Sequence, residues 1–189
     1  MKRIMVTLAY LLAALLLTAI TPRALELHGP FVTAGRDGYA VSDNLVVELT
    51  GSPAISRVAE NSYGEVLEAD DGAVFLAIPL RVTNVHTPDQ FLNYYLEVGG
   101  ARYGADMGLG TFTSSIFTTT QPRIWMQDTA GFVISREVFD DASRVTLFVQ
   151  SGGGASPDFG EQVSFTLGHV GEVEVIRFER RTMGGTWDG

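Results

Sequence analysis

The residues that could perform metal or thiol chemistry are few and scattered along this chain. Its three histidines, His28, His86 and His169, are far apart, and none forms a His-x-x-x-His or similar pair. A zinc or copper site built on one element needs such a spacing. The chain has no cysteine, which excludes thiolate ligands, thiol nucleophiles and disulfides. We therefore predict no metal centre and no bound cofactor.

Carboxylates and serines also lack a catalytic pattern. The runs Asp70-Asp71-Gly72 and Asp140-Asp141 do not have the spacing of an ordered calcium loop, and Asp is common in solvated turns. The 22 acidic residues allow many carboxylate pairs for glycoside cleavage, but no spacing singles one out. A Ser-His-Asp triad is defined by geometry, yet no Gly-x-Ser-x-Gly elbow is present. We expect a protein that is not an enzyme.

Aromatic side chains are the better candidates for binding. Tyr94 and Tyr95 are adjacent, so on a strand one points into the core and the other to the opposite face. Trp125 has polar neighbours and offers a flat surface that could stack on a sugar or on a partner side chain. More often, a tryptophan in this setting caps a sandwich core. Tyr94, Tyr95 and Trp125 are the candidate ligand-binding residues, with burial in the core as the alternative.

The chain opens with Lys2 and Arg3, followed by an uncharged apolar run over residues 4–20. As a helix this run is about 25 Å long, slightly short of a hydrocarbon core of roughly 30 Å. It is longer than the apolar stretch of about 7–15 residues in a signal peptide, and Ala19 and Ala24 offer poor cleavage positions. We predict that residues 1–24 form an uncleaved signal anchor, with a cleaved signal peptide as the alternative.

The charge distribution indicates the location and limits the partners. The positive-inside rule places the amino terminus in the cytoplasm and the rest of the chain outside. Behind the apolar run, from residue 21 on, lie 11 of the 13 basic residues and all 22 acidic residues, a formal net charge of −11. This charge disfavours nucleic acid. We expect a single-pass protein of the cytoplasmic membrane with an extracytoplasmic domain, or a secreted protein after cleavage, and another envelope or membrane protein as its partner.

Period-two alternation is the main pattern behind the leader. Over residues 73–83 it places Val74, Leu76, Ile78, Leu80 and Val82 on one face of a strand. Proline has no N–H to donate, so we expect Pro79 at an edge position or a bulge.

Shorter runs of the same kind occupy residues 45–49, 92–98, 132–138, 145–149, 163–167 and 173–178. Turn signals separate them, and Gly99-Gly100 predicts a two-residue hairpin turn of type I′. Seven to nine short strands without a long helix predict an all-β, antiparallel, immunoglobulin-like β-sandwich over residues 25–181. We expect residues 182–189 to form a flexible tail unless Trp187 docks.

Four segments resemble a known family: AVFLAIPLRVTN (73–84), YYLEVGGARYGAD (94–106), GFVISREVF (131–139) and RVTLFV (144–149). The family is a widespread bacterial one of unknown function, with exported, telokin-like immunoglobulin domains related to mycobacterial secreted immunoprotective antigens. The positions that match its pattern are Gly100, Tyr103, Gly131, Val138 and Phe139. The chain departs from it where Gly99-Gly100 replaces Asp-Gly and Ala130-Gly131 replaces Pro-Gly. The resemblance spans residues 45–167 and implies the fold and the export, with no catalytic residue.

These patterns lead to one function and one alternative. We predict a membrane-anchored or secreted, non-enzymatic β-sandwich that serves as a protein-interaction module in the cell envelope, with contacts made by sheet edges or an apolar patch. The alternative is a small-ligand or glycan-binding sandwich, in which Trp125 and one of Tyr94 and Tyr95 line one exposed groove.

Overall fold

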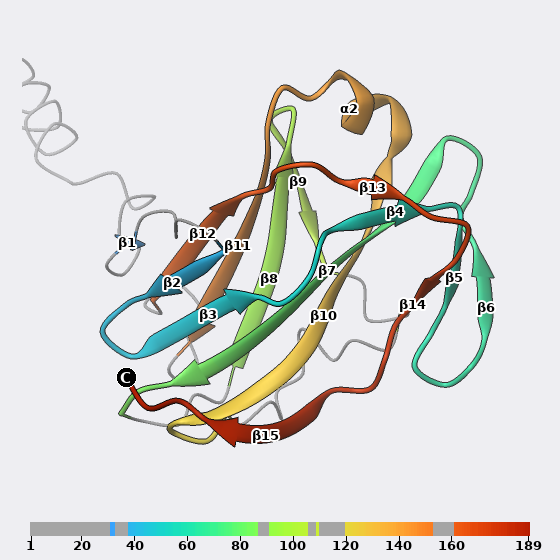
Figure 1. Cartoon of the computed structure of the whole chain (residues 1–189). Helices are drawn as coiled ribbons and strands as arrows, with labels where there is room; N and C mark the ends of the chain where they lie inside the picture. Colours follow the sequence, from blue (N-terminus) through green and yellow to red (C-terminus); the bar gives the residue numbers. More distant parts are fainter. Residues whose placement is uncertain (1–30, 33–37, 87–90, 106–108, 110–119, 153–160) are drawn as a thin grey trace, which may run out of the picture.

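The computed structural model of the protein describes residues 31–32, 38–86, 91–105, 109, 120–152 and 161–189. Two large β-sheets, here called sheet A and sheet B, pack face to face, and a small sheet C lies beside them (Figure 1). The predicted, mostly antiparallel β-sandwich is confirmed. The predicted leader, residues 1–24, lies outside the described residues, and among the latter no helix is both long and apolar enough to cross a membrane.

Sheet A has the strand order β1-β12-β11-β8-β9. Its strands are β1 (Phe31–Val32), β12 (Gln162–Thr166), β11 (Val145–Gly152), β8 (Phe91–Val98) and β9 (Ala101–Gly104). The turn between β8 and β9 consists of Gly99 at φ 56° and Gly100 at φ 82°, and Val98 pairs with Ala101. Two consecutive positive φ angles are what a type I′ turn requires, so the predicted hairpin is confirmed.

Sheet B is built around two long antiparallel strands, β7 (Ala73–Asn84) and β10 (Ile124–Ser135). The other strands of its main path are β13 (Gly171–Glu172), β4 (Ala54–Ser56) and β15 (Thr182–Thr186). β2 (Tyr39–Val41) pairs with β3 (Leu45–Leu49), which in turn pairs with β7. β7 is thus a central strand, flanked by β10 on one side and by β3 and β4 on the other.

The main core fills the space between sheets A and B. The alternating apolar residues of β7 all belong to it, as predicted: Val74, Leu76, Ile78, Leu80 and Val82. Phe132 of β10 and Phe165 of β12 are its largest fully buried side chains. Each fully buried side chain of this size contributes about 1.5–3 kcal/mol relative to exposure, so burial holds a chain that has no disulfide.

Pro79 lies in the middle of β7, at a gap in the neighbouring ladder. Thr50 donates its N–H to the Pro79 carbonyl at 3.0 Å, so the backbone of Pro79 faces the side of β3 and β4. On that side β3 pairs with β7 as far as Leu80 and β4 begins to pair at Ala77. Pro79 therefore stands opposite the connection between two strands, where the missing N–H costs no sheet hydrogen bond.

A second, smaller core lies on the outer face of sheet B. It joins Phe75 and Ala77 of β7 to the inner side of sheet C, whose strands are β14 (Ile176–Arg177), β5 (Val58–Glu60) and β6 (Val66–Glu68). A Cβ placed on Gly131 of β10 would lie 2.7 Å from Phe178 Cε1 and 2.8 Å from Leu109 Cδ1. The absence of a side chain at this position therefore lets sheet C pack closely against sheet B.

Two segments differ from their predicted structure. The strand expected over residues 132–138 ends at Ser135, and helix α2 (Arg136–Asp141) follows, with the Ser135 hydroxyl as N-cap acceptor for Val138 N. Over residues 173–178, only the two-residue strand β14 forms, and it pairs in parallel with β5, while β13, just before this segment, pairs in parallel with β4. In both places the apolar residues are too few to distinguish strand from helix or loop by periodicity.

The C-terminal tail was expected to be flexible unless Trp187 docks, and Trp187 does dock. Residues 182–186 form β15 on the free edge of β10. The Trp187 indole Nε1 donates to the Tyr39 hydroxyl at 2.8 Å, and its backbone N–H donates to the Arg123 carbonyl at 2.9 Å. These contacts tie the tail to β2 and to the beginning of β10.

Candidate functional site

The first of the three predicted ligand-binding residues, Tyr94, is a core residue. It lies on β8 with 3% of its surface exposed and belongs to the main core. Its hydroxyl donates to Asp128 Oδ2 at 3.2 Å across the sandwich. Burial, followed by the negative charge of Asp128, raises the pKa of Tyr94 well above its ordinary value.

Tyr95 points to the outer face of sheet A, and neighbours occupy both faces of its ring. Phe148 of β11 stacks on it with ring centroids 4.7 Å apart, and the Arg102 guanidinium of β9 lies 4.6 Å from its centroid. Because β9 and β11 flank β8 on opposite sides, the two contacts use opposite faces of the ring. The Tyr95 hydroxyl is hydrogen-bonded to Gln162 Oε1. Burial is the main cause that raises the pKa of Tyr95.

Trp125 is buried, with 5% of its surface exposed, but it is not part of the sandwich interior. It lies on the outer face of sheet B, one residue before the core residue Met126. The Arg81 guanidinium covers its ring at 4.3 Å and is held there by Glu48, whose carboxylate lies 2.6 Å from Arg81 Nη2. The three aromatic residues thus lie in three separate places and do not line the one exposed groove that the glycan-binding alternative requires.

A buried ion pair, which the sequence did not single out, closes one side of the sandwich. Asp128 points inward from β10 with 1% of its side chain exposed, and Arg181 Nη2 lies 2.5 Å from its Oδ2. The same carboxylate accepts the Tyr94 hydroxyl and, through Oδ1, the Thr129 N–H at 2.9 Å. A fully bonded pair of this kind fixes the chain between sheet C and β15 onto the sandwich. An aspartate within an otherwise alternating strand was the available signal.

The two most exposed large apolar side chains of the described chain lie on sheet C and in its turn, and a third exposed one lies beside it. Tyr63, in the turn between β5 and β6, is 60% exposed, and Val66 on β6 is 70% exposed. Val175, before β14, is 44% exposed. Ile176 belongs to the outer core, so Val175 and Arg177 face away from it. We call this outward side the valine–carboxylate face; its members are Val58, Glu60, Val66, Glu68, Val175 and Arg177.

The free edge of β6 adds backbone groups to this face. Asn61 donates its N–H to the Glu65 carbonyl, so Glu65 bonds toward β5. Every second residue of an antiparallel strand bonds to the same neighbour, so Leu67 also bonds toward β5, and the N–H and C=O groups of Val66 and Glu68 point away from it. Within the described ranges no strand pairs with this edge. The edge therefore has backbone donors and acceptors beside an exposed valine.

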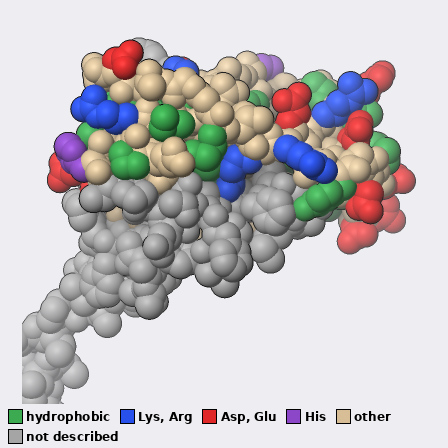
Figure 2. Space-filling model, turned by 90° about the horizontal axis from the view of Figure 1, so that it is seen from below, with side chains coloured by type: hydrophobic (Ala, Val, Ile, Leu, Met, Phe, Trp, Pro, Cys, Tyr) green, Lys and Arg blue, Asp and Glu red, His purple; other side chains and the backbone are tan. Residues whose placement is uncertain are grey.

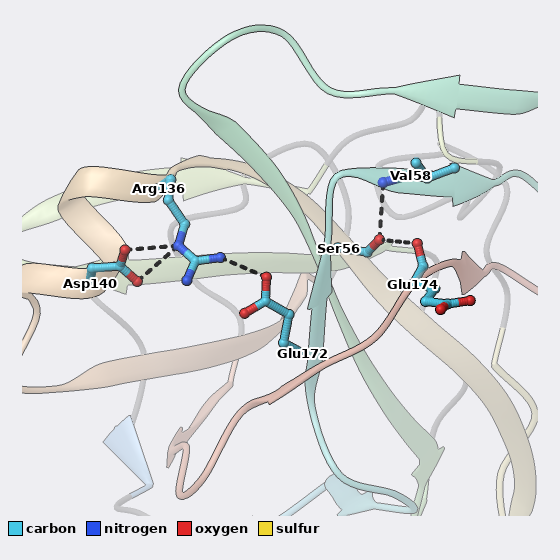
Figure 3. Close-up of polar contacts among 6 residues, drawn as sticks. All are labelled: Ser56, Val58, Arg136, Asp140, Glu172 and Glu174. Atoms are coloured by element: carbon cyan, nitrogen blue, oxygen red, sulfur yellow. Dashed lines mark hydrogen bonds and ion pairs between the residues drawn. The ribbon is translucent and has the colours of Figure 1, made fainter.

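Two polar clusters hold the C-terminal chain, one against the connection of β4 to β5 and the other against helix α2, and so position sheet C. Figure 3 shows the Ser56 hydroxyl donating to the Glu174 carbonyl at 2.8 Å and accepting from Val58 N at 3.0 Å. In the second cluster Arg136, at the start of α2, binds Asp140 at 2.8 Å and Glu172 at 3.1 Å (Figure 3). These clusters set the orientation of the segment that leads into β14.

The charge of this end of the molecule is strongly negative. Residues 57–72, which include β5 and β6, contain five carboxylates and one arginine, a formal net charge of −4. Figure 2 shows acidic side chains most densely at its right-hand end, which is the end of sheet C in Figure 1. In the described part of the chain, no three His, Asp or Glu side chains come together as a metal site would need. The surface is therefore suited to cationic and apolar groups of a partner.

The fold defines the chain as a β-sandwich protein. Comparisons with known proteins do not narrow this class to a family. No family model and no curated protein matches it. An uncharacterized β-sandwich protein from Clostridium difficile 630 is 14% identical with a TM-score of 0.43, and the match covers 75% of this chain and 97% of that one. A conserved hypothetical protein from Bacillus anthracis is 16% identical with a TM-score of 0.47, covering 68% of this chain and 94% of that one. No argument about function rests on either likeness.

Proposed function

We propose that this protein is a non-enzymatic interaction module of the cell envelope, and that sheet C is the surface that binds its partner. Membrane anchoring through residues 1–24, with secretion after cleavage as the alternative, and membership of the telokin-like exported family belong to the same proposal. The partner is another envelope or membrane protein. It presents a basic, partly apolar segment, which complements the formal charge of −4 over residues 57–72.

One observation carries this proposal: the open edge of β6 contains the most exposed valine of the described chain, Val66. Val66 is 70% exposed, and its backbone N–H and C=O point away from β5. An extended segment that adds to such an edge gains main-chain hydrogen bonds, while side-chain contacts to Val58 and Val66 give selectivity. The strand has only three residues, so the edge alone is short, and the exposed face beside it must supply the remaining contact area.

Site-specific photo-crosslinking of the full-length protein in living cells tests the proposal. A photoreactive residue placed at Val66 or Val175 should give one discrete crosslinked product of the same mass at both sites. The matched control is Thr166, which is exposed on β12 of sheet A, in the opposite layer. It should give no such product.

Charge reversal adds a second arm. Glu60 and Glu68 both lie on the valine–carboxylate face, and converting them to lysine should abolish the product at Val175 if a basic segment docks there. Reversal of Glu137 on helix α2 is the control for a general loss of charge. A crosslinking pattern that is equal at Val66, Val175 and Thr166, or the absence of any product, would refute the proposal.

A further inference from the structure

A polar pocket on the outer face of sheet B is separate from the valine–carboxylate face. It has a volume of about 200 Å³ and lies between the end of β3, the middle of β7 and β10, and the chain that enters β15. Figure 1 shows this last segment running beside β10 after β14. Besides Asp128, which points into the sandwich, its polar lining residues are Thr50, Gln127, Thr129, Glu179, Arg180 and Thr182. We call it the threonine pocket.

The strand register explains why these side chains converge. Gln127 and Thr129 are two residues apart on β10 and therefore share its outer face. Thr182 of β15 pairs with Gln127, and Pro79 of β7 pairs with Thr129, so four neighbouring positions of the sheet meet there. Thr50 joins them because its N–H is bonded to the Pro79 carbonyl at 3.0 Å. Pro79 thus gives the pocket one apolar surface, and the threonines give it a wall rich in hydroxyl groups.

Most of these polar side chains have no partner inside the protein. In the described part of the chain, the hydroxyls of Thr50, Thr129 and Thr182, the Gln127 amide and the Glu179 carboxylate make no hydrogen bond or ion pair. The neighbouring Asp128 contrasts with them, because its carboxylate is fully used by Tyr94, Arg181 and the Thr129 N–H. The sandwich thus completes its own polar network next to a concave wall whose donors and acceptors remain available.

The chemistry of this wall selects a neutral ligand that carries several hydroxyl groups. Three hydroxyls and one amide can each donate and accept, as sugar hydroxyls do. Glu179 and Arg180 have opposite charges, and the charge of the third ionised lining residue, Asp128, is balanced by Arg181, so the pocket has no net charge with which to select an ion. The volume is below the roughly 300–1,000 Å³ of pockets for drug-sized ligands, which limits the occupant to one small ring. Pro79 offers an apolar surface for the C–H face of such a ring.

We propose that the threonine pocket binds a single sugar ring, either a free monosaccharide or the end of a glycan chain, through Gln127, Thr129, Thr182 and Thr50. The site is independent of the interaction face on sheet C, so either assignment can fail without the other. Few hydrogen bonds in a half-open pocket give weak binding, with a Kd on the order of 1 mM.

Saturation-transfer NMR on the full chain, held in a detergent without a sugar headgroup, tests the site. The probes are D-glucose, D-galactose and N-acetyl-D-glucosamine, with glycine as a zwitterion of similar polarity. At least one sugar should give a saturable signal, whereas glycine should give none. A short glycan ending in the same sugar distinguishes the two sources: tighter binding than that of the monosaccharide indicates a chain end.

Matched variants connect the signal to the pocket. T129V removes a hydroxyl with little change of shape, and Q127L removes the amide; each should weaken sugar binding about fivefold or more. T166V makes the same change as T129V on the outer face of sheet A and should leave binding unchanged. If either pocket variant fails to fold by circular dichroism, T50A at the exposed end of β3 takes its place. Absence of a sugar signal up to about 20 mM, a signal from glycine alone, or equal binding by T129V and T166V would overturn the proposal.

Discussion

The main core between sheets A and B and the outer core under sheet C are built from strands of very different length. β7 and β10 have 12 residues each and pair over ten positions, from Ala73–Ser135 to Val82–Met126. β5 and β6 have three residues each, and β14 has two. Long strands bury an entire face, whereas short ones bury one or two side chains and leave the others at the surface.

This difference separates the residues that stabilise the fold from those that we propose bind a partner. The main core gathers fully buried apolar residues from both large sheets. The outer core rests on a few residues, among them Ala59, Phe75 and Phe178, while the opposite side of the same small sheet exposes Val66. The valine–carboxylate face therefore contributes little to the packing of the fold. Five substitutions probe this division, in order of decreasing effect.

The largest effect is expected from F132A in the centre of the main core. Phe132 is fully buried, and its removal leaves a cavity that two rigid sheets cannot fill, so unfolding free energy should fall by about 3–5 kcal/mol. Urea titration followed by circular dichroism measures the change. A loss below about 1 kcal/mol would mean that the interior is loosely packed and that the contrast between the two cores does not hold.

The second effect concerns the buried ion pair beside the main core. R181A leaves the Asp128 carboxylate buried without its cation and should cost about 3 kcal/mol. R180A, which alters the exposed neighbouring arginine, is the control and should change stability by less than about 0.5 kcal/mol. Equal urea midpoints for the two variants would show that this ion pair does not hold the C-terminal chain.

The third effect tests the outer core directly. In G131A the new Cβ meets Phe178 and Leu109 at 2.7 and 2.8 Å, so sheet C must shift outward, with an expected loss of about 1–2 kcal/mol. Hydrogen exchange should locate the change in β5, β6 and β14 and spare β8 and β11. Exchange that rises uniformly in both layers would instead indicate that the two cores unfold as one unit.

The fourth effect depends on pH and concerns Tyr94. Its pKa in the folded protein lies above the unfolded value of 10.0, so the folded state holds the proton more tightly. The stabilisation that the protonated Tyr94 gives to the folded state is present in full below pH 10. It is lost as the pH rises above 10, and the unfolding free energy then falls by at most about 1.4 kcal/mol per pH unit. Urea midpoints between pH 9 and pH 11 should fall less steeply in Y94F. If the urea midpoints of the two proteins fall in parallel, Tyr94 is not the source of the pH dependence.

The smallest effect on stability is expected at the valine–carboxylate face. V66S changes a residue that is 70% exposed and should alter unfolding free energy by less than about 0.5 kcal/mol. The same substitution should reduce the crosslink formed from Val175, since it removes an apolar contact at the proposed face. A large loss of stability would show that Val66 serves the fold and not a partner.

Strand patterns predicted most of the sandwich, because alternation reports burial locally. The five apolar residues of β7 and the Gly99-Gly100 turn were read correctly from neighbours in the chain. Helix α2 was missed because six residues without a buried member carry no helical pattern. The residue that covers Trp125 could not be predicted, for another reason. This residue, Arg81, comes from a strand more than forty residues earlier in the chain.

The candidate sites depended almost wholly on contacts between distant segments. The threonine pocket unites Thr50, Gln127 and Thr182, which belong to three separate segments of the chain. Sheet C ends at β6 because β14, more than a hundred residues later in the chain, pairs with the other side of β5. Neither feature has a local sequence pattern.

Alternation along the chain specified which side chains face inward, where turns fall and that sheets rather than helices form the body of this protein. It did so because side-chain direction in a strand follows from the backbone of that strand alone. Which strands become neighbours, which aspartate is buried beside an arginine and where polar side chains remain without partners were decided by packing. Those outcomes depend on the pairing of segments far apart in the chain, and no single segment carries that information.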